Sequence, residues 1–221
     1  HHLAGITNVA YVKKESNLER DALIKSTAIQ GTQNILDSMS DKAKIIFPST
    51  HVIFEGLKST KLNITENEQP STFLAYSSSK VNNEQQIIKS GKNYIILRLG
   101  SVYGFSGDAT RINIMPNLFS KIASQNGTIK LFSGGKQLKS LSPLIDVARC
   151  FKFMEEKNIK KEIFNVTKET VTVNSKETEN FLEEFDKMNV DDISPRQSLD
   201  FLYKLKVKRQ RHNNGKSKFK K

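Results

Sequence analysis

The stretch AKIIFPST, residues 43–50, decides how the rest of the chain can fold. Its apolar residues are consecutive, and it ends in small polar ones. This pattern is typical of a buried strand in a parallel sheet, whose carboxyl end delivers polar side chains to a site. We therefore predict a parallel strand here, with Ser49 and Thr50 at its functional end.

Apolar spacing on either side of this stretch alternates between the helical and the extended kind. Helices are expected over residues 17–39, 76–90, 113–124 and 146–156. Strands are expected over residues 128–132 and 162–166, and residues 93–104 are expected to form a buried strand that ends in a Gly/Ser loop. Strands that alternate with helices favour an α/β fold with a mostly parallel sheet.

Tyr76 and Lys80 stand four residues apart in YSSSK. On a helix this spacing puts both side chains on one face, one turn apart. A tyrosine with its ordinary pKa of about 10 is a weak base at neutral pH, and a nearby ammonium favours the phenolate. An isolated Tyr-x-x-x-Lys is more often a plain polar helix surface, so the pair is an acid/base candidate only in context.

The net charge of +12 belongs mostly to one end of the chain. Residues 204–221 hold nine Lys or Arg and no acid, so the other 203 residues carry only +3. No apolar run approaches the length of about 20 residues that crosses a bilayer, and no cluster has metal-ligand spacing. Cys150 is the only cysteine, which excludes an internal disulfide and, with no export signal, predicts the cytoplasm.

Several motifs follow one another in a fixed order. They are HLAG (2–5), PSTHVIFEG (48–56), YSSSK (76–80), ILRLGSVYG (96–104) and PLIDVARC (143–150). This series resembles the extended short-chain dehydrogenase/reductase family, the NAD-dependent nucleotide-sugar epimerases and dehydratases, from residue 1 to about residue 173. The resemblance implies a Rossmann-like parallel sheet with a small substrate domain, NAD or NADP as cofactor, and a nucleotide sugar as substrate.

The resemblance also implies catalytic roles for three residues. Tyr76 would take the proton of a substrate hydroxyl while hydride leaves to nicotinamide, and Lys80 would support the phenolate and bind the nicotinamide ribose. Thr50 would hold the substrate oxygen, because it stands three residues before Ile53 as in the family's pattern. Ser49 remains open as the alternative.

Further site residues are implied by position in the matching motifs. Those implied to contact the cofactor are His2, Leu3, Ala4, Gly5, Ser49, Tyr76, Lys80, Leu99 and Gly100. Those implied to contact the substrate are His51, Ser101, Arg111 and Lys139. Arg111 and Lys139 are candidates for the diphosphate. Many members have Arg at the position of Lys139, and lysine keeps the charge but loses the bidentate fork.

Two departures from the family refine these expectations. The dehydratase branch follows its catalytic Thr with an Asp-Glu pair, whereas His51 and Val52 stand here, which favours an epimerase or a simple reductase. The family's first strand, Gly-rich turn and ribose-reading acid would all precede His1, so we expect this chain to bind NAD weakly or not at all and its activity to be impaired. The family commonly dimerises through the helices expected at residues 17–39 and 76–90, which predicts a homodimer.

The C-terminal stretch has a different resemblance. Residues 181–206 are similar to the extreme C-terminus of the mismatch-repair ATPase MutS, a self-association helix. The likeness is carried by Ser194, Pro195, Ser198, Leu199, Leu202, Tyr203 and Lys206. The alternative function is therefore a non-catalytic remnant or chimera whose basic end self-associates or binds nucleic acid weakly and non-specifically. A solvated, disordered tail is the competing interpretation.

These observations divide the chain into four expected parts. Residues 1–104 form the later half of an NAD-binding Rossmann domain, and residues 105–173 form the substrate-binding region. Residues 174–206 form a helical segment, and residues 207–221 form a basic disordered tail.

Overall fold

The computed structural model describes residues 1–6, 17–105, 111–135 and 137–172. The expected helical segment 174–206 and the expected disordered tail 207–221 lie outside these residues, so both stay predictions. Within the described part, helices pack on two small sheets.

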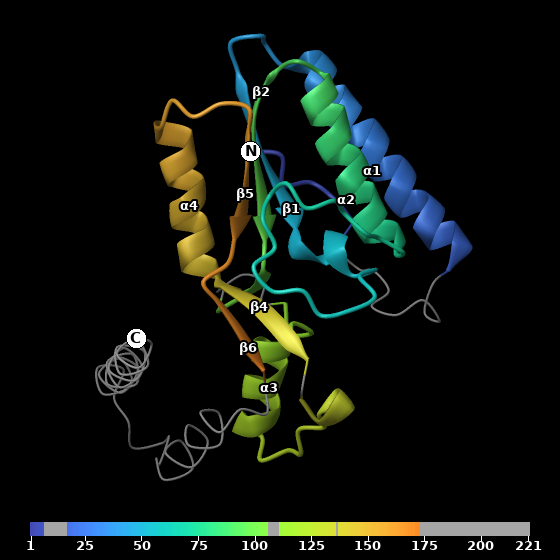
Figure 1. Ribbon diagram of the computed structural model, residues 1–221, viewed down its shortest axis with the longest axis vertical. Helices are drawn as coiled ribbons and strands as arrows, with labels where there is room; N and C mark the ends of the chain where they lie inside the picture. The colour runs from blue at the N-terminus through green and yellow to red at the C-terminus, as the bar shows by residue number, and fades with distance from the viewer. Residues whose placement is uncertain (7–16, 106–110, 136, 173–221) are drawn as a thin grey trace, which may run out of the picture. The chain divides into compact units, whose positions relative to one another are not determined.

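The main sheet has three parallel strands in the order β1–β2–β5 (Figure 1). They span Lys44–Thr50 (β1), Asn93–Leu99 (β2) and Glu162–Val166 (β5). The apolar residues at the middle of β2 are completely buried, as the consecutive apolar run predicts. The register pairs Thr50 with Leu99, so β1 and β2 end side by side. The expected α/β fold with a Rossmann-like parallel sheet is confirmed.

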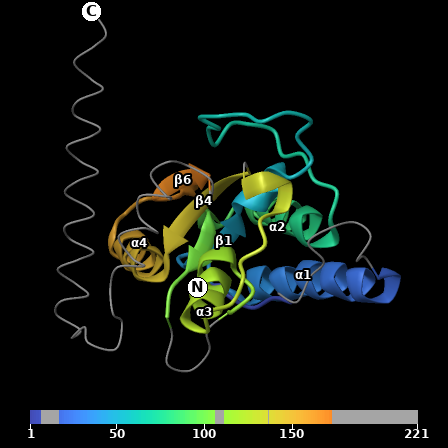
Figure 2. The same ribbon diagram turned by 90° about the horizontal axis from the view of Figure 1, so that it is seen from below.

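Helices cover both faces of this sheet (Figures 1 and 2). Helices α1 (Leu18–Ser38) and α2 (Ala75–Lys89) lie on one face, and α4 (Leu144–Glu156) lies on the other. Successive strand residues alternate between the two cores, since side chains of a strand point to opposite faces. The core under α1 and α2 contains Leu36, Ile45, Phe47, Ile87, Tyr94 and Ile96, and the core under α4 contains Ile46, Ile95, Leu97, Val147, Phe151 and Met154.

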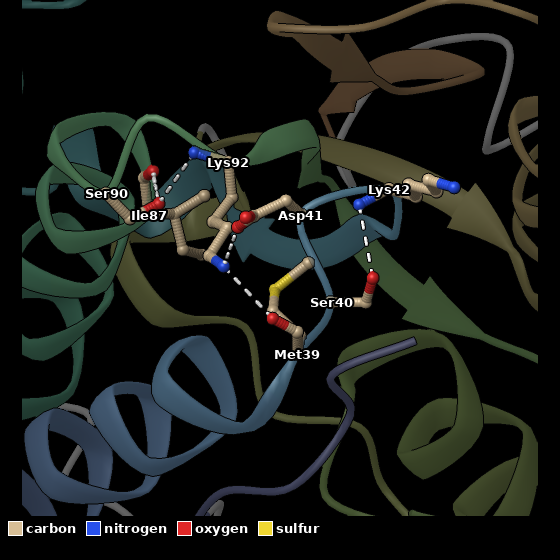
Figure 3. Close-up of polar contacts among 7 residues, drawn as sticks. All are labelled: Met39, Ser40, Asp41, Lys42, Ile87, Ser90 and Lys92. Atoms are coloured by element: carbon tan, nitrogen blue, oxygen red, sulfur yellow. Dashed lines mark hydrogen bonds and ion pairs between the residues drawn. The ribbon is translucent and has the colours of Figure 1, made fainter.

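Side chains form hydrogen bonds with backbone groups at both ends of helix α1. The Asn17 side chain accepts a hydrogen bond from the Arg20 amide at 3.0 Å and so caps the first turn. At the other end, Lys92 Nζ donates to the Met39 carbonyl at 3.0 Å and pairs with Asp41 (Figure 3). Such contacts satisfy backbone groups that a helix end leaves without a partner inside the helix. They hold α1 against the amino end of the sheet.

A second sheet follows the main one in the chain. It has the order β3–β4–β6, with β3 (Ser101–Tyr103) parallel and β6 (Glu169–Thr172) antiparallel to β4 (Leu138–Pro143). We expected the strand from residue 93 to end in a Gly/Ser loop. Strand β2 does end at Leu99, but the chain continues past Gly100 into β3 of the second sheet. A Cβ at Gly100 would lie 2.8 Å from Ser142 Oγ and 2.9 Å from the Ser140 carbonyl oxygen. Glycine is needed there because two backbones approach closely.

The four predicted helices are present, each within two residues of its expected ends, and α3 spans Met115–Ser124. One local prediction is wrong. Residues 128–132 form no strand, and a short 3₁₀ helix begins at Phe132 instead. The apolar run at residues 128–132 is too short to distinguish a strand from a loop. The strand that does form nearby is β4, which is stabilised by pairing with β3 and β6. Asp146 lies in the first turn of α4 without capping it, and its carboxylate contacts Arg149 and Lys168.

Candidate active site

The carboxyl end of β1 meets the first turns of α2. Lys80 Nζ donates to the carbonyl oxygen of Pro48 at 2.8 Å. The same nitrogen lies 4.6 Å from the ring centroid of Phe47 and 5.9 Å from that of Tyr76. The spacing of Tyr76 and Lys80 therefore brings both side chains to one place, beside the end of the strand that carries Thr50.

Lys80 is an unusual lysine because little water reaches it. Burial lowers its pKa from 10.5 to about 8, and the carboxylate of Glu84 opposes this shift only in part. A lysine whose pKa is lowered this far is a candidate for a functional site, because strongly shifted pKa values are common there. Of its three N–H donors, one is used by the Pro48 carbonyl, and no other hydrogen bond involves it in the described part of the chain.

Helix α2 starts without a capping side chain at its own N-cap residue, Leu74. Glu55, from the loop after β1, replaces that cap. Its Oε1 accepts from the amides of Phe73 and Leu74, the latter at 2.9 Å, and from the Ser77 hydroxyl. A carboxylate at a helix N-terminus is stabilising. Glu55 therefore ties the start of α2, and Tyr76 with it, to the chain that leaves β1.

Ser49 and Thr50 point to different partners. The Ser49 hydroxyl donates to the buried carboxylate of Glu84. Thr50 Oγ1 accepts from the Val52 amide at 3.3 Å, a contact with its own turn. Ser49 therefore belongs to a buried polar network, and Thr50 is the better placed of the two for a substrate oxygen. The choice of Thr50 stays a prediction.

Ser49 belongs to a network built around one buried ion pair. Arg98 Nη2 and Nε donate to the two oxygens of Glu84 at 2.8 and 3.1 Å, and both side chains are at most 5% exposed. Arg98 Nη1 also donates to the Glu66 carbonyl at 2.8 Å, and Glu66 Oε1 accepts from the Asn165 amide. The network joins α2, β2, β5 and the 55–72 loop at the carboxyl edge of the sheet.

His51 follows Thr50 and begins a short 3₁₀ helix, His51–Phe54. Its Nδ1 lies 3.0 Å from the Leu99 carbonyl oxygen. A carbonyl only accepts, so Nδ1 carries the proton. Burial lowers the pKa of His51, the bond to Leu99 opposes this, and the charge of Lys139 lowers the pKa further. In the neutral ring the lone pair is therefore on Nε2.

The residues of HLAG differ sharply in burial. His2 is 6% exposed, and a hydrogen bond of 3.0 Å joins its Nε2 to Thr32 Oγ1 on α1. Its Nδ1 is buried and finds no hydrogen-bond partner in the described part of the chain. Burial, followed by the charge of Lys80, lowers the pKa of His2. Leu3, Ala4 and Gly5 are exposed.

The remaining expected site residues lie beyond the ends of β1 and β2. Leu99 ends β2, Gly100 makes the change of sheet, and Ser101 starts β3 opposite Leu141. Lys139 lies on β4, close enough to His51 to act on its pKa. Arg111 is exposed, and its Nε donates to Asn113 at 3.1 Å. The role of Arg111 stays a prediction.

Sequence reasoning missed three residues that shape this region. Glu84 stands four residues after Lys80 and thus continues the Tyr76–Lys80 face of α2, a signal that was available in the spacing. Glu55 and Arg98 had no such signal, because their partners are distant in the chain.

A parallel sheet with helices on both faces, whose neighbouring strands end side by side, is the arrangement of a Rossmann-like fold. The chain belongs to the NAD dependent epimerase/dehydratase family, whose sequence model matches residues 2–167. The resemblance stated from the motifs is thereby confirmed.

Solved structures of nucleotide-sugar enzymes share this fold. The UDP-glucose 4-epimerase of Thermotoga maritima, crystallised with UDP-glucose, is 25% identical with a TM-score of 0.63, over 78% of this chain and 58% of its own. The UDP-glucuronic acid 4-epimerase of Bacillus cereus, with UDP-glucuronic acid and NAD, is 22% identical with a TM-score of 0.65, over 83% and 59%. The dTDP-glucose 4,6-dehydratase DesIV of Streptomyces venezuelae, with NAD, is 19% identical with a TM-score of 0.64, over 83% and 56%. The chain thus spans less than two thirds of each.

Residues 177–208 match the C-terminal region of the DNA mismatch repair protein MutS, as the motif predicted, and lie outside the described residues. No curated protein matches the chain. Among the residues that the structure describes, no helix has the length and apolar character to span a membrane.

Proposed function

We propose that the carboxyl end of β1 is the reaction site of an NAD-dependent oxidoreductase that acts on a nucleotide sugar, as an epimerase or a simple reductase. The observation that carries the proposal is the position of Lys80, held by the Pro48 carbonyl at the strand end and 5.9 Å from the Tyr76 ring. Tyr76, Lys80 and Thr50 are the proposed catalytic residues.

In this proposal each side chain has a separate task. Tyr76 removes the proton of a sugar hydroxyl as the carbon is oxidised and returns it in the reverse step. Lys80 stabilises the phenolate through its positive charge, an effect that is strong because water is excluded there. Thr50 donates its hydroxyl proton to the substrate oxygen and orients it toward Tyr76.

When bound, the cofactor supplies a nicotinamide ring that accepts hydride and returns it. The residues present fit such a group. Lys80 has N–H donors left after its bond to Pro48, and His2 Nδ1 is a buried atom without a partner in the described residues. Leu3, Ala4, Gly5, Leu99 and Gly100 are the other proposed cofactor contacts, and Ser101, Arg111 and Lys139 are proposed substrate contacts.

Association and location follow as secondary proposals. Side chains of Leu23, Ile29 and Ile88 are 56%, 39% and 41% exposed on α1 and α2, which supports a homodimer through these helices. Cytoplasmic location is proposed because Cys150 is the only cysteine. The second candidate function is self-association or weak non-specific nucleic-acid contact by the basic C-terminus, and the match of residues 177–208 to the MutS C-terminal region supports the self-association form.

The test is a coupled measurement of turnover and stability. The 221-residue chain is incubated with NAD and UDP-glucose or UDP-glucuronic acid, and the epimerised product is quantified together with any NADH that forms as the sugar hydroxyl is oxidised. Tyr76→Phe should lower turnover by about 100- to 10,000-fold without a change in melting temperature. Ser78→Ala is the matched control, because the Ser78 hydroxyl bonds only within α2, to the Ala75 carbonyl. Equal turnover in Tyr76→Phe and the unchanged chain would refute the proposal.

A further inference from the structure

His2 and Lys80 lie at the same edge of β1. The Ile46 carbonyl oxygen accepts from the His2 amide at 3.1 Å, and the Pro48 carbonyl oxygen accepts from Lys80 Nζ at 2.8 Å. Carbonyls two residues apart in a strand point to the same side and are separated by about 6.6 Å. The Phe47 ring contacts both side chains, with its centroid 5.5 Å from that of the His2 ring and 4.6 Å from Lys80 Nζ. The two polar side chains are therefore neighbours beside one aromatic ring.

A chain of hydrogen bonds fixes which ring nitrogen of His2 carries the proton. With its amide nitrogen toward the carbonyls of Ala28 and Ser79, each 3.2 Å away, Asn83 donates twice. Its oxygen then accepts from Thr32 Oγ1 at 3.2 Å. Thr32 thus gives its one hydroxyl proton to Asn83 and accepts from His2 Nε2 at 3.0 Å. In the neutral ring the lone pair of His2 is therefore on Nδ1.

This lone pair is buried and unused. His2 is 6% exposed, and its Nδ1 has no hydrogen-bond partner among the described residues. Burial, followed by the charges of Lys80 and of the N-terminal amine, lowers the pKa of His2, so Nδ1 stays an acceptor. Lys80 has the complementary need, because it makes one hydrogen bond in the described part of the chain and carries three N–H donors. Buried donors and acceptors without partners cost folding free energy, so a group that satisfies both would be stabilising.

We propose that one buried water molecule bridges Lys80 Nζ and His2 Nδ1, so that His2 is a positioning residue for Lys80. The water accepts from the ammonium and donates to the imidazole, and two hydrogen bonds of about 2.8 Å suit neighbours at successive carbonyls of a strand edge. This assignment rests on the proposed function, in which Lys80 stabilises the Tyr76 phenolate. The Pro48 carbonyl and the water hold the ammonium from two sides and leave its third N–H for a ligand.

The bridge should favour the charged form of Lys80. A hydrogen bond to the charged form of a group stabilises that form, and the water is a better acceptor when its own proton is bound by the imidazole. Glu84 acts on the pKa of Lys80 in the same direction, and burial acts against both. Loss of the bridge should therefore lower the pKa of Lys80 below its value in the unchanged chain.

Two substitutions of His2 separate the tasks of its two ring nitrogens. Asn carries its side-chain oxygen two bonds from Cβ, as Nδ1 is, and Gln carries its amide nitrogen three bonds from Cβ, as Nε2 is. His2→Asn therefore keeps the acceptor of the bridge and loses the donor to Thr32, and His2→Gln does the reverse. NMR of the lysine side chains as a function of pH measures the pKa of Lys80, whose signal is identified by its loss in Lys80→Met.

The two variants should differ in opposite ways in two measurements. The pKa of Lys80 should fall by about one unit in His2→Gln and by less than about 0.3 unit in His2→Asn. His2→Asn should nevertheless melt at the lower temperature, because it loses the bond to Thr32. Equal pKa values of Lys80 in the two variants overturn the proposal, since a packing role of the ring would affect both alike.

The unchanged chain supplies a test that needs no stable variant. Nitrogen NMR of the imidazole should show His2 protonated on Nε2, and a proton on Nδ1 in the neutral ring overturns the bridge. These signals require no turnover. A difference in Lys80 pKa between the variants, in a chain where Tyr76→Phe changes nothing, would support the bridge and refute the proposed reaction. Turnover that depends on Tyr76, with equal Lys80 pKa values, would refute the bridge alone.

Discussion

Two lysines at opposite ends of the main sheet donate to backbone carbonyls, yet their surroundings differ. Lys92, at the amino end, bonds the Met39 carbonyl and also pairs with the exposed carboxylate of Asp41, whose pKa this bond lowers (Figure 3). Lys80, at the carboxyl end, bonds Pro48 and has no hydrogen-bonded carboxylate, so burial lowers its own pKa to about 8. The ion pair of Lys92 stabilises the fold. Burial of the Lys80 ammonium costs folding free energy, which is typical of a residue kept for binding or catalysis.

The largest effect on stability is expected at the buried network near Lys80. Arg98→Met should lower the free energy of unfolding by about 3–5 kcal/mol, because it leaves the Glu84 carboxylate buried without its partner. Urea denaturation measures the change. The control is Arg149→Met, whose ion pair with Asp146 lies on the surface, and whose loss should cost less than about 0.5 kcal/mol. Similar losses in the two variants would contradict the buried network.

Replacement of Lys80 should raise stability, whereas replacement of Arg98 lowers it. Lys80→Met removes a desolvated ammonium and loses one hydrogen bond, so we expect the chain to gain about 1 kcal/mol of stability. Turnover should fall with the loss of the positive charge near Tyr76. Thermal melting and product assays on the same sample test both. A clear loss of stability would mean that Lys80 serves the fold, as Lys92 does.

The dependence of stability on pH should come from His2 and His51. Their pKa values are lowered in the folded chain, so near and below the ordinary value of about 6.5 the unfolded chain binds more protons. The contribution of the two histidines to stability is therefore complete above that pH and is lost as the pH falls through their folded pKa values, whereas Lys80, whose pKa is lowered to about 8, adds a rise in stability only at alkaline pH. Melting temperatures measured across this range should fall, and His2→Leu should flatten the dependence. A flat profile in the unchanged chain would contradict the lowered pKa values.

At the amino end we expect a stability change of about the same size as at Lys80 but of opposite sign, and no change in turnover. Lys92→Met removes one hydrogen bond from the C-terminus of α1 and should lower the free energy of unfolding by about 1 kcal/mol, with no effect on turnover. Urea denaturation and the product assay test this. A Lys92→Met variant that lost turnover while keeping its stability would contradict the division between the two ends.

Local patterns predicted the helices, the three strands of the main sheet and the Tyr76–Lys80 pair. Each depends on residues close in sequence, where periodicity and spacing are informative. The second sheet was not predicted, since β4 has few apolar residues and is defined by pairing with β3 and β6. The capping of α2 by Glu55 was missed for the same reason, because the carboxylate comes from 19 residues before Leu74.

The sequence by itself determined that buried parallel strands alternate with helices and that a phenol and an ammonium share one face of a helix. Only the tertiary structure decided that this ammonium is desolvated against Phe47 and Pro48, that Ser49 turns toward Glu84, and that His51 keeps its lone pair on Nε2. Burial and hydrogen bonding depend on distances between segments far apart in the chain, and those distances exist only after the helices pack on the sheet.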